Sequence, residues 1–444
     1  MRKEYDVIIV GASVSGLCMA NFLAKKGINI LIIDLKKIKD IGNGIDDKIV
    51  TEESIDFLKN AFDIRIPAKF IENKVEKIHI GSINQSCVEV NTNYYIVNKK
   101  LFSAYLLGKI IELENVSVLE KHEIFDLLEE DKKIVGVKVK DISRGINLDF
   151  FGKIIVDASG STAIIRRKIK PNRFFLNELD DFDTAVYYQE SLKTNGTNIV
   201  PKLLFDPSSI KAGYVFITPK KDSLVLGIGI NEKTKNIKKL FTDYKNELIN
   251  PENETTLLES SKGIIPLRRP LDSFVYRNIM LLGDSACQVN PLVNNDISYG
   301  LKGSYFASKA ILDALKNSII NTQSLWSYNT NFMRELGAKC AFLECIRDFF
   351  SSLSTEEFDF IFNENIIPSS LIENLDDKLN RRDVIFNNAR LFLKPKLFHK
   401  FLKLSDYSKN MKFLYDNYPS YDDFAVWKQK LGENLENIRK SFLV

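Results

Sequence analysis

The residues from Tyr5 to Asp34 constrain the fold of this 444-residue chain more than any other stretch. The runs VIIV at 7–10 and ILII at 30–33 are continuous, apolar and β-branched, which is typical of parallel strands covered on both faces. An apolar helical stripe lies between them, and Gly27 marks the end of that helix. The stretch therefore predicts a strand–helix–strand unit of about 30 residues, the setting in which a dinucleotide-binding fingerprint is meaningful.

The turn of this unit carries such a fingerprint, with one departure. Gly11 and Gly16 hold the first and last glycine positions, which allow the tight turn and the close packing of helix on strand. Ser13 replaces the middle glycine, whose missing side chain lets a pyrophosphate approach the backbone. Asp34 ends the second strand, where a carboxylate accepts hydrogen bonds from an adenosine ribose. We expect an ADP-containing cofactor, with Asp34 at its ribose and its pyrophosphate at Gly11, Ser13, Ser15 and Gly16.

The composition, 45% hydrophobic and 27% charged, is that of an ordinary soluble globular protein. A formal charge of +4 is nearly balanced and does not favour nucleic-acid binding. The five cysteines are scattered, as buried thiols in a reducing compartment would be, and the three histidines show no metal-ligand spacing. No apolar run reaches the roughly 18 residues of a membrane span, and no signal peptide is visible. We expect a cytoplasmic protein without a metal, and at this length two or three lobes.

The rest of the chain is expected to contain further helices, buried strands, a strand-rich middle and a helical C-terminal part. Helices are expected at about 52–62, 99–113 and 237–248, and a strand followed by a hairpin within 116–141. The buried strand IIVDA, which runs into Gly160, and the buried strand NIMLL before Gly283 are expected to return to the first sheet. Between them the chain is strand-rich, and beyond residue 324 it is helical and rich in Phe and Leu.

Three separated motifs resemble one family when they are taken in order. The N-terminal fingerprint, the strand ending VDASG and the LLGDSACQVNP loop before a helix resemble the FAD-dependent oxidoreductases of the p-hydroxybenzoate hydroxylase fold. The segment GYVFITP at 213–219, followed by Gly227-Ile228-Gly229, is similar to the Tyr-x-Trp-x-Phe-Pro motif and trailing Gly-x-Gly of the geranylgeranyl reductase family. The segments IPLRRPL at 265–271 and FLYDNYP at 413–419 also resemble the archaeal members, which saturate isoprenoid chains of membrane lipids.

The resemblance implies FAD as the cofactor and places further residues at the site. It implies that Asp284 holds a ribityl or phosphate-proximal group of FAD, and that Tyr214 and Phe216 line a lipid cavity beside the flavin ring. The residues expected at the cofactor on this basis are Gly283, Asp284, Pro291, Asn295 and Asp296, and those expected at the substrate are Tyr214, Phe216 and Pro219.

The expected fold class is α/β in three parts. A discontinuous Rossmann-like FAD-binding domain is expected from residues 1–75, 95–170 and 275–323. An antiparallel-sheet substrate domain is expected from 76–94 and 171–274, and a helical C-terminal region from 324–444.

The chain departs from the family pattern at the flavin. Phe216 stands where the family has Trp, and Thr218 where it has Phe. The loop 41–49 lacks the cysteine that archaeal members carry beside the flavin, and Asp46 is the nearest substitute by position. Asn294-Asn295-Asp296 replaces a run of glycines whose N–H groups face the flavin. A carboxylate within about 4–6 Å would oppose the negative charge of reduced flavin by a kcal/mol or more, whereas Asp296 as a helix cap would be harmless and stabilising by about 1 kcal/mol.

The implied reaction is hydride delivery from reduced flavin to an isoprenoid C=C bond, followed by protonation of the adjacent carbon. Two rival hypotheses are an FAD-dependent aromatic monooxygenase of the same fold and a non-catalytic paralogue that binds isoprenoid lipid. No second dinucleotide fingerprint is visible, so the electron donor is expected to be either NAD(P)H or a docked ferredoxin. Peripheral membrane contact through the lysine-rich faces of the C-terminal helices is a further expectation, involving Lys394, Lys396, Lys400 and Lys403.

Overall fold

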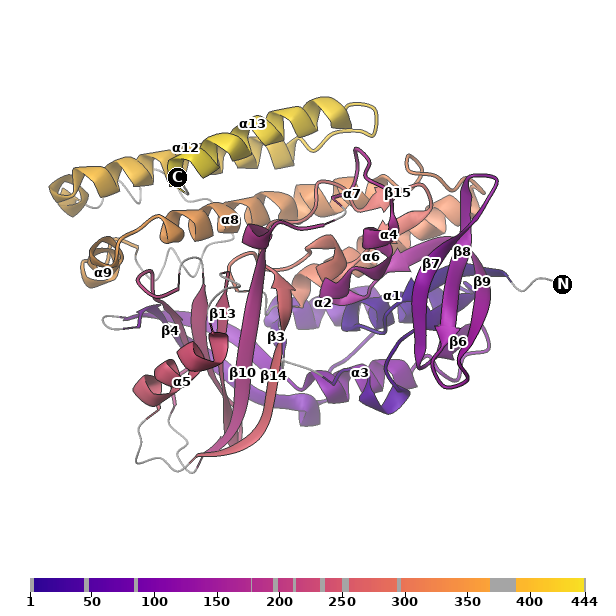
Figure 1. Cartoon of the computed structure of the whole chain (residues 1–444), viewed down its shortest axis with the longest axis horizontal. Coiled ribbons are helices and arrows are strands. Elements are labelled where there is room, and N and C mark those ends of the chain that lie inside the picture. Colours follow the sequence, from indigo (N-terminus) through magenta and orange to yellow (C-terminus); the bar gives the residue numbers. More distant parts are fainter. Residues whose placement is uncertain are drawn as a thin grey trace.

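The computed structural model describes residues 4–43, 48–83, 87–176, 178–194, 199–210, 213–231, 236–249, 255–293, 297–367 and 389–442. Within these ranges the chain forms two sheets and a layered set of helices (Figure 1). The two sheets lie in the lower part of the view in Figure 1, and the C-terminal helices lie across its top.

The first sheet is centred on β1 (Glu4–Val10), which pairs in parallel with β2 (Ile30–Ile33) on one side and β9 (Ile146–Asp157) on the other. Its strand order is β15-β16-β9-β1-β2-β6, with β8 paired to β9 and β7 paired to β8. The remaining bounds are β6 (Val116–Leu119), β7 (His122–Glu130), β8 (Lys133–Asp141), β15 (Val275–Tyr276) and β16 (Ile279–Leu281). The predictions that the strand ending at Asp157 and the strand before Gly283 return to the first sheet are therefore confirmed, because β9 pairs with β1 and β16 pairs with β9.

Helices cover the first sheet, and polar caps define where several of them begin. Ser13, Thr51 and Asn98 each accept a hydrogen bond from a backbone N–H in the first turn of the helix that follows. These helices are α1 (Val14–Ala24), α2 (Glu52–Phe62) and α3 (Lys99–Gly108), and α6 (Ser298–Lys316) packs on α1. The expected helix at 99–113 is five residues too long, because α3 ends at Gly108 and turns follow it.

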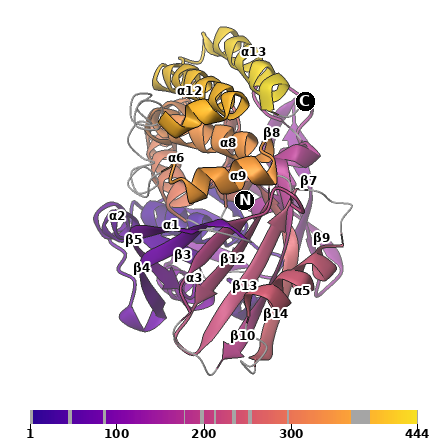
Figure 2. The ribbon, with the colours of Figure 1, turned by 90° about the vertical axis from the view of Figure 1, so that its left-hand side faces the viewer.

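The second sheet has the order β14-β10-β13-β12-β11-β4-β5-β3, and its pairs are antiparallel except for β11 with β4. Its strands are β3 (Lys48–Thr51), β4 (Ile71–Ser82), β5 (Cys87–Val97), β10 (Thr184–Thr194), β11 (Lys202–Phe205), β12 (Tyr214–Pro219), β13 (Ser223–Ile230) and β14 (Thr255–Pro266). Helix α5 (Ile237–Leu248) covers one face of it (Figure 2). The sheet also takes β3 and the first residues of β4, which lie within the 1–75 segment expected in the FAD-binding domain. The division into domains itself stays a prediction.

The C-terminal region is helical, as expected. Helix α7 (Ser327–Phe332) continues through a π-helical turn (Met333–Gly337) into α8 (Ala338–Ser351), and α9 (Thr355–Asn363) follows. Helices α12 (Pro395–Asp416) and α13 (Phe424–Phe442) form an outer layer above α8 (Figures 1 and 2). Among the helices described here, none is both long and apolar enough to cross a bilayer. The five cysteines are free thiols, and only Cys87 is less than fully buried.

Candidate cofactor site

The candidate site lies where the parallel strands of the first sheet end. Val10 pairs with Ile33 and with Asp157, so β1, β2 and β9 finish at one edge. The chain turns sharply there at Gly11, whose φ is +96°, and a Cβ on this residue would lie 2.6 Å from the carbonyl oxygen of Ala158. Only glycine fits this close crossing of two backbones.

Ser13 and Asp34 stabilise the turn from within. The Ser13 hydroxyl accepts a hydrogen bond from the N–H of Gly16 at 3.1 Å and so caps α1. The Asp34 carboxylate accepts from the N–H of Ala12 and from the N–H of Lys36, both at 2.7 Å. The carboxylate predicted to hold a ribose therefore also fixes the turn that would hold the pyrophosphate.

A second carboxylate, the buried Asp157 at the end of β9, makes the hydrogen bonds that order the neighbouring loop. One of its oxygens accepts from the N–H and hydroxyl of Ser159, and the other accepts from the N–H groups of Ile165 and Arg166 at 2.9 Å. Burial raises the pKa of Asp157, and the hydrogen bonds from Ser159 and Arg166 oppose that rise. These bonds hold the loop 158–162 over the glycine turn.

These elements enclose a cavity of about 790 Å³. It brings together four residues that the sequence predicted, namely Gly11, Ser13, Asp34 and Asp284. Ser15, Gly16 and Gly283 do not line the cavity. Ser15 faces α6 instead, because a Cβ on Gly300 would lie 2.3 Å from its hydroxyl. Pro291 is buried and also does not line the cavity. Asp46, Asn294, Asn295 and Asp296 lie outside the described residues, and their roles stay predictions.

Other lining residues were not foreseen from the sequence. They come from α3, from the start of β7, from the short helix α4 (Ile164–Lys168) and from the second sheet, and include Lys99, Ser103, His122, Arg167, Lys168, Tyr187 and Ile265. Ser103 is the most informative, because its buried hydroxyl has no hydrogen-bond partner in the described chain. A buried hydroxyl without a partner costs about 1–3 kcal/mol, so this wall fits a polar ligand group such as a phosphate or a ribityl hydroxyl.

The charges around the cavity favour an anionic ligand. Lys36, Lys99, Arg167 and Lys168 line it, against the carboxylates of Asp34, Glu123 and Asp284. His122 lies at the same wall, with Nδ1 2.6 Å from the carbonyl oxygen of Glu120. The arrangement thus combines a glycine turn at a helix N-terminus, a ribose-type carboxylate and a surplus of cations, which fits the diphosphate of FAD.

Two of the predicted substrate residues, Tyr214 and Phe216, lie on one face of the second sheet, whereas Pro219 at the end of β12 faces the other side. Tyr214 pairs with Gly229 and Phe216 with Gly227 across β12 and β13. A Cβ on Gly227 would lie 2.3 Å from the Phe216 ring, and one on Gly229 would lie 2.9 Å from the Tyr214 ring. The Gly-x-Gly motif therefore leaves the space that the two rings occupy.

The same row of the sheet continues to the cavity. Gly229 pairs with Tyr187 on β10, and Tyr187 pairs with Gly263 on β14, so tyrosines and glycines alternate across four strands. Tyr187 lines the cavity, whereas Tyr214 and Phe216 do not. The Tyr214 hydroxyl donates to the carbonyl of Val293 at 2.8 Å, and the carbonyl of Pro219 accepts from the Asn73 side chain at 3.0 Å.

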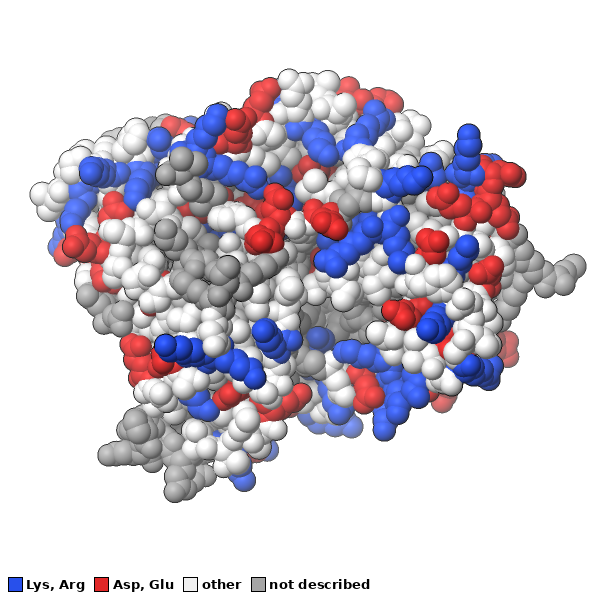
Figure 3. Space-filling model, in the orientation of Figure 1, with Lys and Arg blue, Asp and Glu red and all other residues white. Residues whose placement is uncertain are grey.

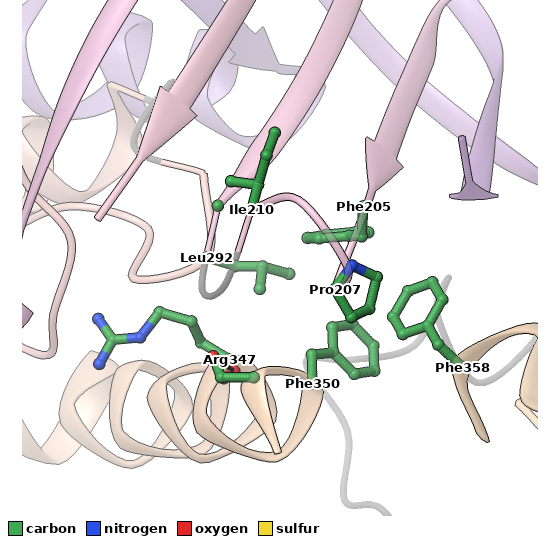
Figure 4. A pocket seen from close by; sticks show the side chains of 9 residues that line it. Phe205, Pro207, Ile210, Leu292, Arg347, Phe350 and Phe358 are labelled. Carbon is green, nitrogen blue, oxygen red and sulfur yellow. Dashed lines mark hydrogen bonds between the residues drawn. The ribbon is translucent and has the colours of Figure 1, made fainter. Parts of the chain in front are cut away.

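Gly213, which precedes Tyr214 in the sequence, lines a small apolar pocket (Figure 4). The rings of Phe205, Phe350 and Phe358 surround Pro207 there, and the Arg347 guanidinium points away from them. The pocket reaches the C-terminal helices α8 and α9, as an elongated lipid pocket beside Tyr214 would. Its volume of about 20 Å³ nevertheless holds one water molecule rather than an isoprenoid chain.

The two arginines of the IPLRRPL segment form a buried ion network, whereas Ile265 at its start lines the cavity. Arg268 binds Asp183 at 2.7 Å, and Arg269 binds Asp272 at 2.8 Å and Glu344 of α8 at 3.3 Å. Burial alone would raise the pKa of Asp272, but Arg269, Arg268 and Lys428 hold it below the usual range. The network joins the loop before β15 to the C-terminal helices.

Comparison with known proteins is consistent with this geometry. Residues 4–175 match the family model described as FAD binding domain. The digeranylgeranylglycerophospholipid reductase of Sulfolobus acidocaldarius is 26% identical over 450 residues, which cover 99% of each chain. Digeranylgeranylglycerophospholipid reductase 1 of Methanococcoides burtonii is 22% identical over 81% of this chain and 87% of that protein.

Solved structures share the fold. A geranylgeranyl bacteriochlorophyll reductase-like protein from Thermoplasma acidophilum superposes with a TM-score of 0.76, at 16% identity, over 91% of this chain and all of that one. A flavin-dependent brominase superposes with a TM-score of 0.64, also at 16% identity, over 98% of this chain and all of that one. The predicted resemblance to the geranylgeranyl reductases is thus confirmed over nearly the whole chain. The predicted cofactor, FAD, is confirmed by the match of the N-terminal part to an FAD binding domain.

Proposed function

We propose that this protein is an FAD-dependent reductase that saturates C=C bonds of an isoprenoid or isoprenoid lipid. The observation that carries the proposal is one continuous cavity, which runs from the dinucleotide turn at Gly11 to Tyr187 and Ile265 on the second sheet. A cofactor held at the first end would present its far end to the second sheet. The similarity to digeranylgeranylglycerophospholipid reductases supports an isoprenoid as the substrate.

Each part of the cavity has a role in this proposal. The turn at Gly11 and Ser13 would hold the pyrophosphate, and Asp34 the adenosine ribose. Lys99 and Ser103, one helical turn apart on α3, would neutralise and bond the remaining polar groups. When bound, FAD supplies the hydride from its reduced ring.

At the other end of the cavity the chain would orient the alkene and exclude water. Ile264 and Ile265 provide apolar surface, and the hydroxyl of Tyr187 lies on the same wall. The electron donor that we propose is NAD(P)H or a ferredoxin, and the place of action is the cytoplasmic face of a membrane that holds the lipid. Because the flavin-side cysteine is missing and Asn294-Asn295-Asp296 replaces the family's glycine run, the proposal includes slower or altered chemistry.

The test begins with the purified protein, which we expect to be yellow and to release FAD on denaturation. The flavin is then reduced chemically without oxygen and mixed with a geranylgeranyl lipid in detergent. Flavin reoxidation and a lipid that gains two hydrogens per double bond would support the proposal. A colourless protein that still binds the lipid would replace the reductase with a non-catalytic carrier. A product that gains oxygen in air would replace it with a monooxygenase.

Removal of the Asp34 carboxylate is expected to weaken FAD binding by roughly 1–3 kcal/mol, because both the ribose and the N–H of Ala12 lose an acceptor. FAD retention during dialysis measures this in Asp34→Ala. Asp34→Asn keeps one acceptor oxygen and is expected to retain an intermediate amount. Parent-like retention in Asp34→Ala would remove Asp34 from the cofactor site.

A further inference from the structure

Two neighbouring apolar side chains are exposed at the corner where α12 begins. Phe392 and Leu393 end the 3₁₀ turn Ala389–Leu393, and they are 63% and 76% exposed. Leu391 of the same turn is fully buried, and the Phe392 ring packs 4.9 Å from that of Phe398 in α12. The turn is therefore held firmly against the helix while it presents two large apolar groups to the outside.

The sequence that forms this corner is cationic, and helix α9 and its C-cap beside it supply the nearby carboxylates. Residues 389–405 contain five Lys or Arg and no Asp or Glu. Arg390 pairs with Glu364 and Lys400 with Glu357, whereas Lys394, Lys396 and Lys403 make no ion pair within the described chain. Figure 3 shows an uncharged tip at the left-hand end of the molecule, with Lys and Arg side chains beside it and Asp and Glu side chains below it.

We infer that this corner, from Ala389 to Lys403, docks the protein on the surface of an anionic lipid bilayer. Exposed apolar side chains enter the boundary between headgroups and acyl chains, and nearby cations are attracted to anionic headgroups. Either signal alone gives weak and reversible binding, and the two together give stable attachment. The inference rests on the proposed function only in the choice of a lipid surface, since the isoprenoid lipid would reside there.

The shape of the corner favours a bilayer over a protein partner. A stable protein interface covers about 800 Å² on each side and seats its anchor residues in pockets. Here the apolar surface is a small protruding tip with charges around it. Such a tip fits a soft, planar surface that closes around it.

Vesicle sedimentation with the full-length protein tests the inference. The vesicles contain equal parts of anionic phosphatidylglycerol and neutral phosphatidylcholine, and a second set contains phosphatidylcholine alone. We expect the parent to bind the anionic vesicles and to be released by high salt, because salt screens the cations. The double variant Phe392→Ser/Leu393→Ser is expected to bind at least tenfold more weakly, because two side chains no longer enter the bilayer.

A matched control comes from the same helix. Phe413 is 69% exposed but lies beside the ion pair of Lys412 with Asp416, so Phe413→Ser is expected to bind as the parent does. The charge variant Lys396→Glu/Lys403→Glu is expected to lose its preference for anionic vesicles. The inference is overturned if the parent fails to bind, if the double variant binds normally, or if Phe413→Ser loses as much.

These outcomes are separate from those of the proposed function. The FAD content of each variant, and its reduction of an isoprenoid lipid dissolved in detergent, are expected to equal those of the parent. A protein that binds vesicles without flavin would contradict the reductase and leave the docking surface standing. A protein that reduces the lipid in detergent but does not bind vesicles would support the reductase and contradict the docking surface.

Discussion

Arg269→Met is expected to lower the free energy of unfolding by roughly 3–5 kcal/mol, because it removes the nearest cation from two buried carboxylates. Arg269 lies 2.8 Å from Asp272 and 3.3 Å from Glu344, and all three side chains are less than a tenth exposed. Methionine fills much of the same volume, so the loss reports charge rather than a cavity. Urea unfolding at neutral pH measures it.

The expected loss depends on pH in a direction that the network fixes. The pKa of Asp272 lies below its ordinary value, so its contribution to stability is present above that value and disappears as the pH falls through the lowered one. In Arg269→Met that pKa rises, and the carboxylate can be buried uncharged at lower pH. The difference between parent and variant is therefore expected to be largest near neutrality and to shrink in acid.

An exposed ion pair provides the control. Arg390→Met removes the pair with Glu364, whose arginine is largely in solvent, and is expected to cost less than about 1 kcal/mol. Equal losses from Arg269→Met and Arg390→Met would contradict the view that the IPLRRPL segment holds the C-terminal helices in place.

Gly11→Ala is expected to abolish FAD retention and to destabilise the fold by about 2 kcal/mol or more. The φ of +96° alone costs an alanine about 1–2 kcal/mol. Its Cβ would also lie 2.6 Å from the Ala158 carbonyl, so the turn and the loop that holds Asp157 must separate. Flavin absorbance after gel filtration and thermal unfolding measure the two effects.

Gly27→Ala separates backbone strain from the clash. Gly27 has a φ of +77°, but nothing lies within 4 Å of its added Cβ. This variant is expected to lose only the strain energy and to keep its flavin. Flavin loss in Gly27→Ala, or full flavin content in Gly11→Ala, would contradict the assignment of the turn at Gly11 to the pyrophosphate.

The sequence anticipated the elements whose residues are governed by local rules. The unbroken apolar runs of β1 and β2 could be buried only in a covered parallel sheet. Helices α2 and α5 have the expected bounds, because Thr51 and Asn236 cap them at positions where the apolar stripe starts. Local caps and stripes do not depend on the rest of the chain.

The sequence could not predict which strands pair when the partners lie far apart in the chain. The parallel pair of β4 with β11 joins residues more than 120 positions apart, and nothing in either strand specifies the partner. Lys99 and Ser103 looked like ordinary helix residues. The available signal was the cap at Asn98, which fixes the start of α3 and places both side chains on one helical face.

The sequence predicted only part of the row in which tyrosines and glycines alternate across the second sheet. The sequence showed Tyr214, Phe216, Gly227 and Gly229 as a pattern, but only the register places each ring over a glycine. It also placed Tyr187, which no motif marked, at the end of that row in the cavity wall. The predicted lipid pocket beside the rings is reduced to a space for one water.

The residues that line the candidate cofactor cavity are synthesised at widely separated times. They include Val10 and Asp284, which are separated by most of the chain. A ribosome adds about 5–20 residues per second, so Asp284 is made roughly 15–55 s after Val10. During that interval the N-terminal turn lacks the part of the cavity wall that Asp284 supplies. A flavin that binds in this cavity would therefore be captured late in the biogenesis of the protein.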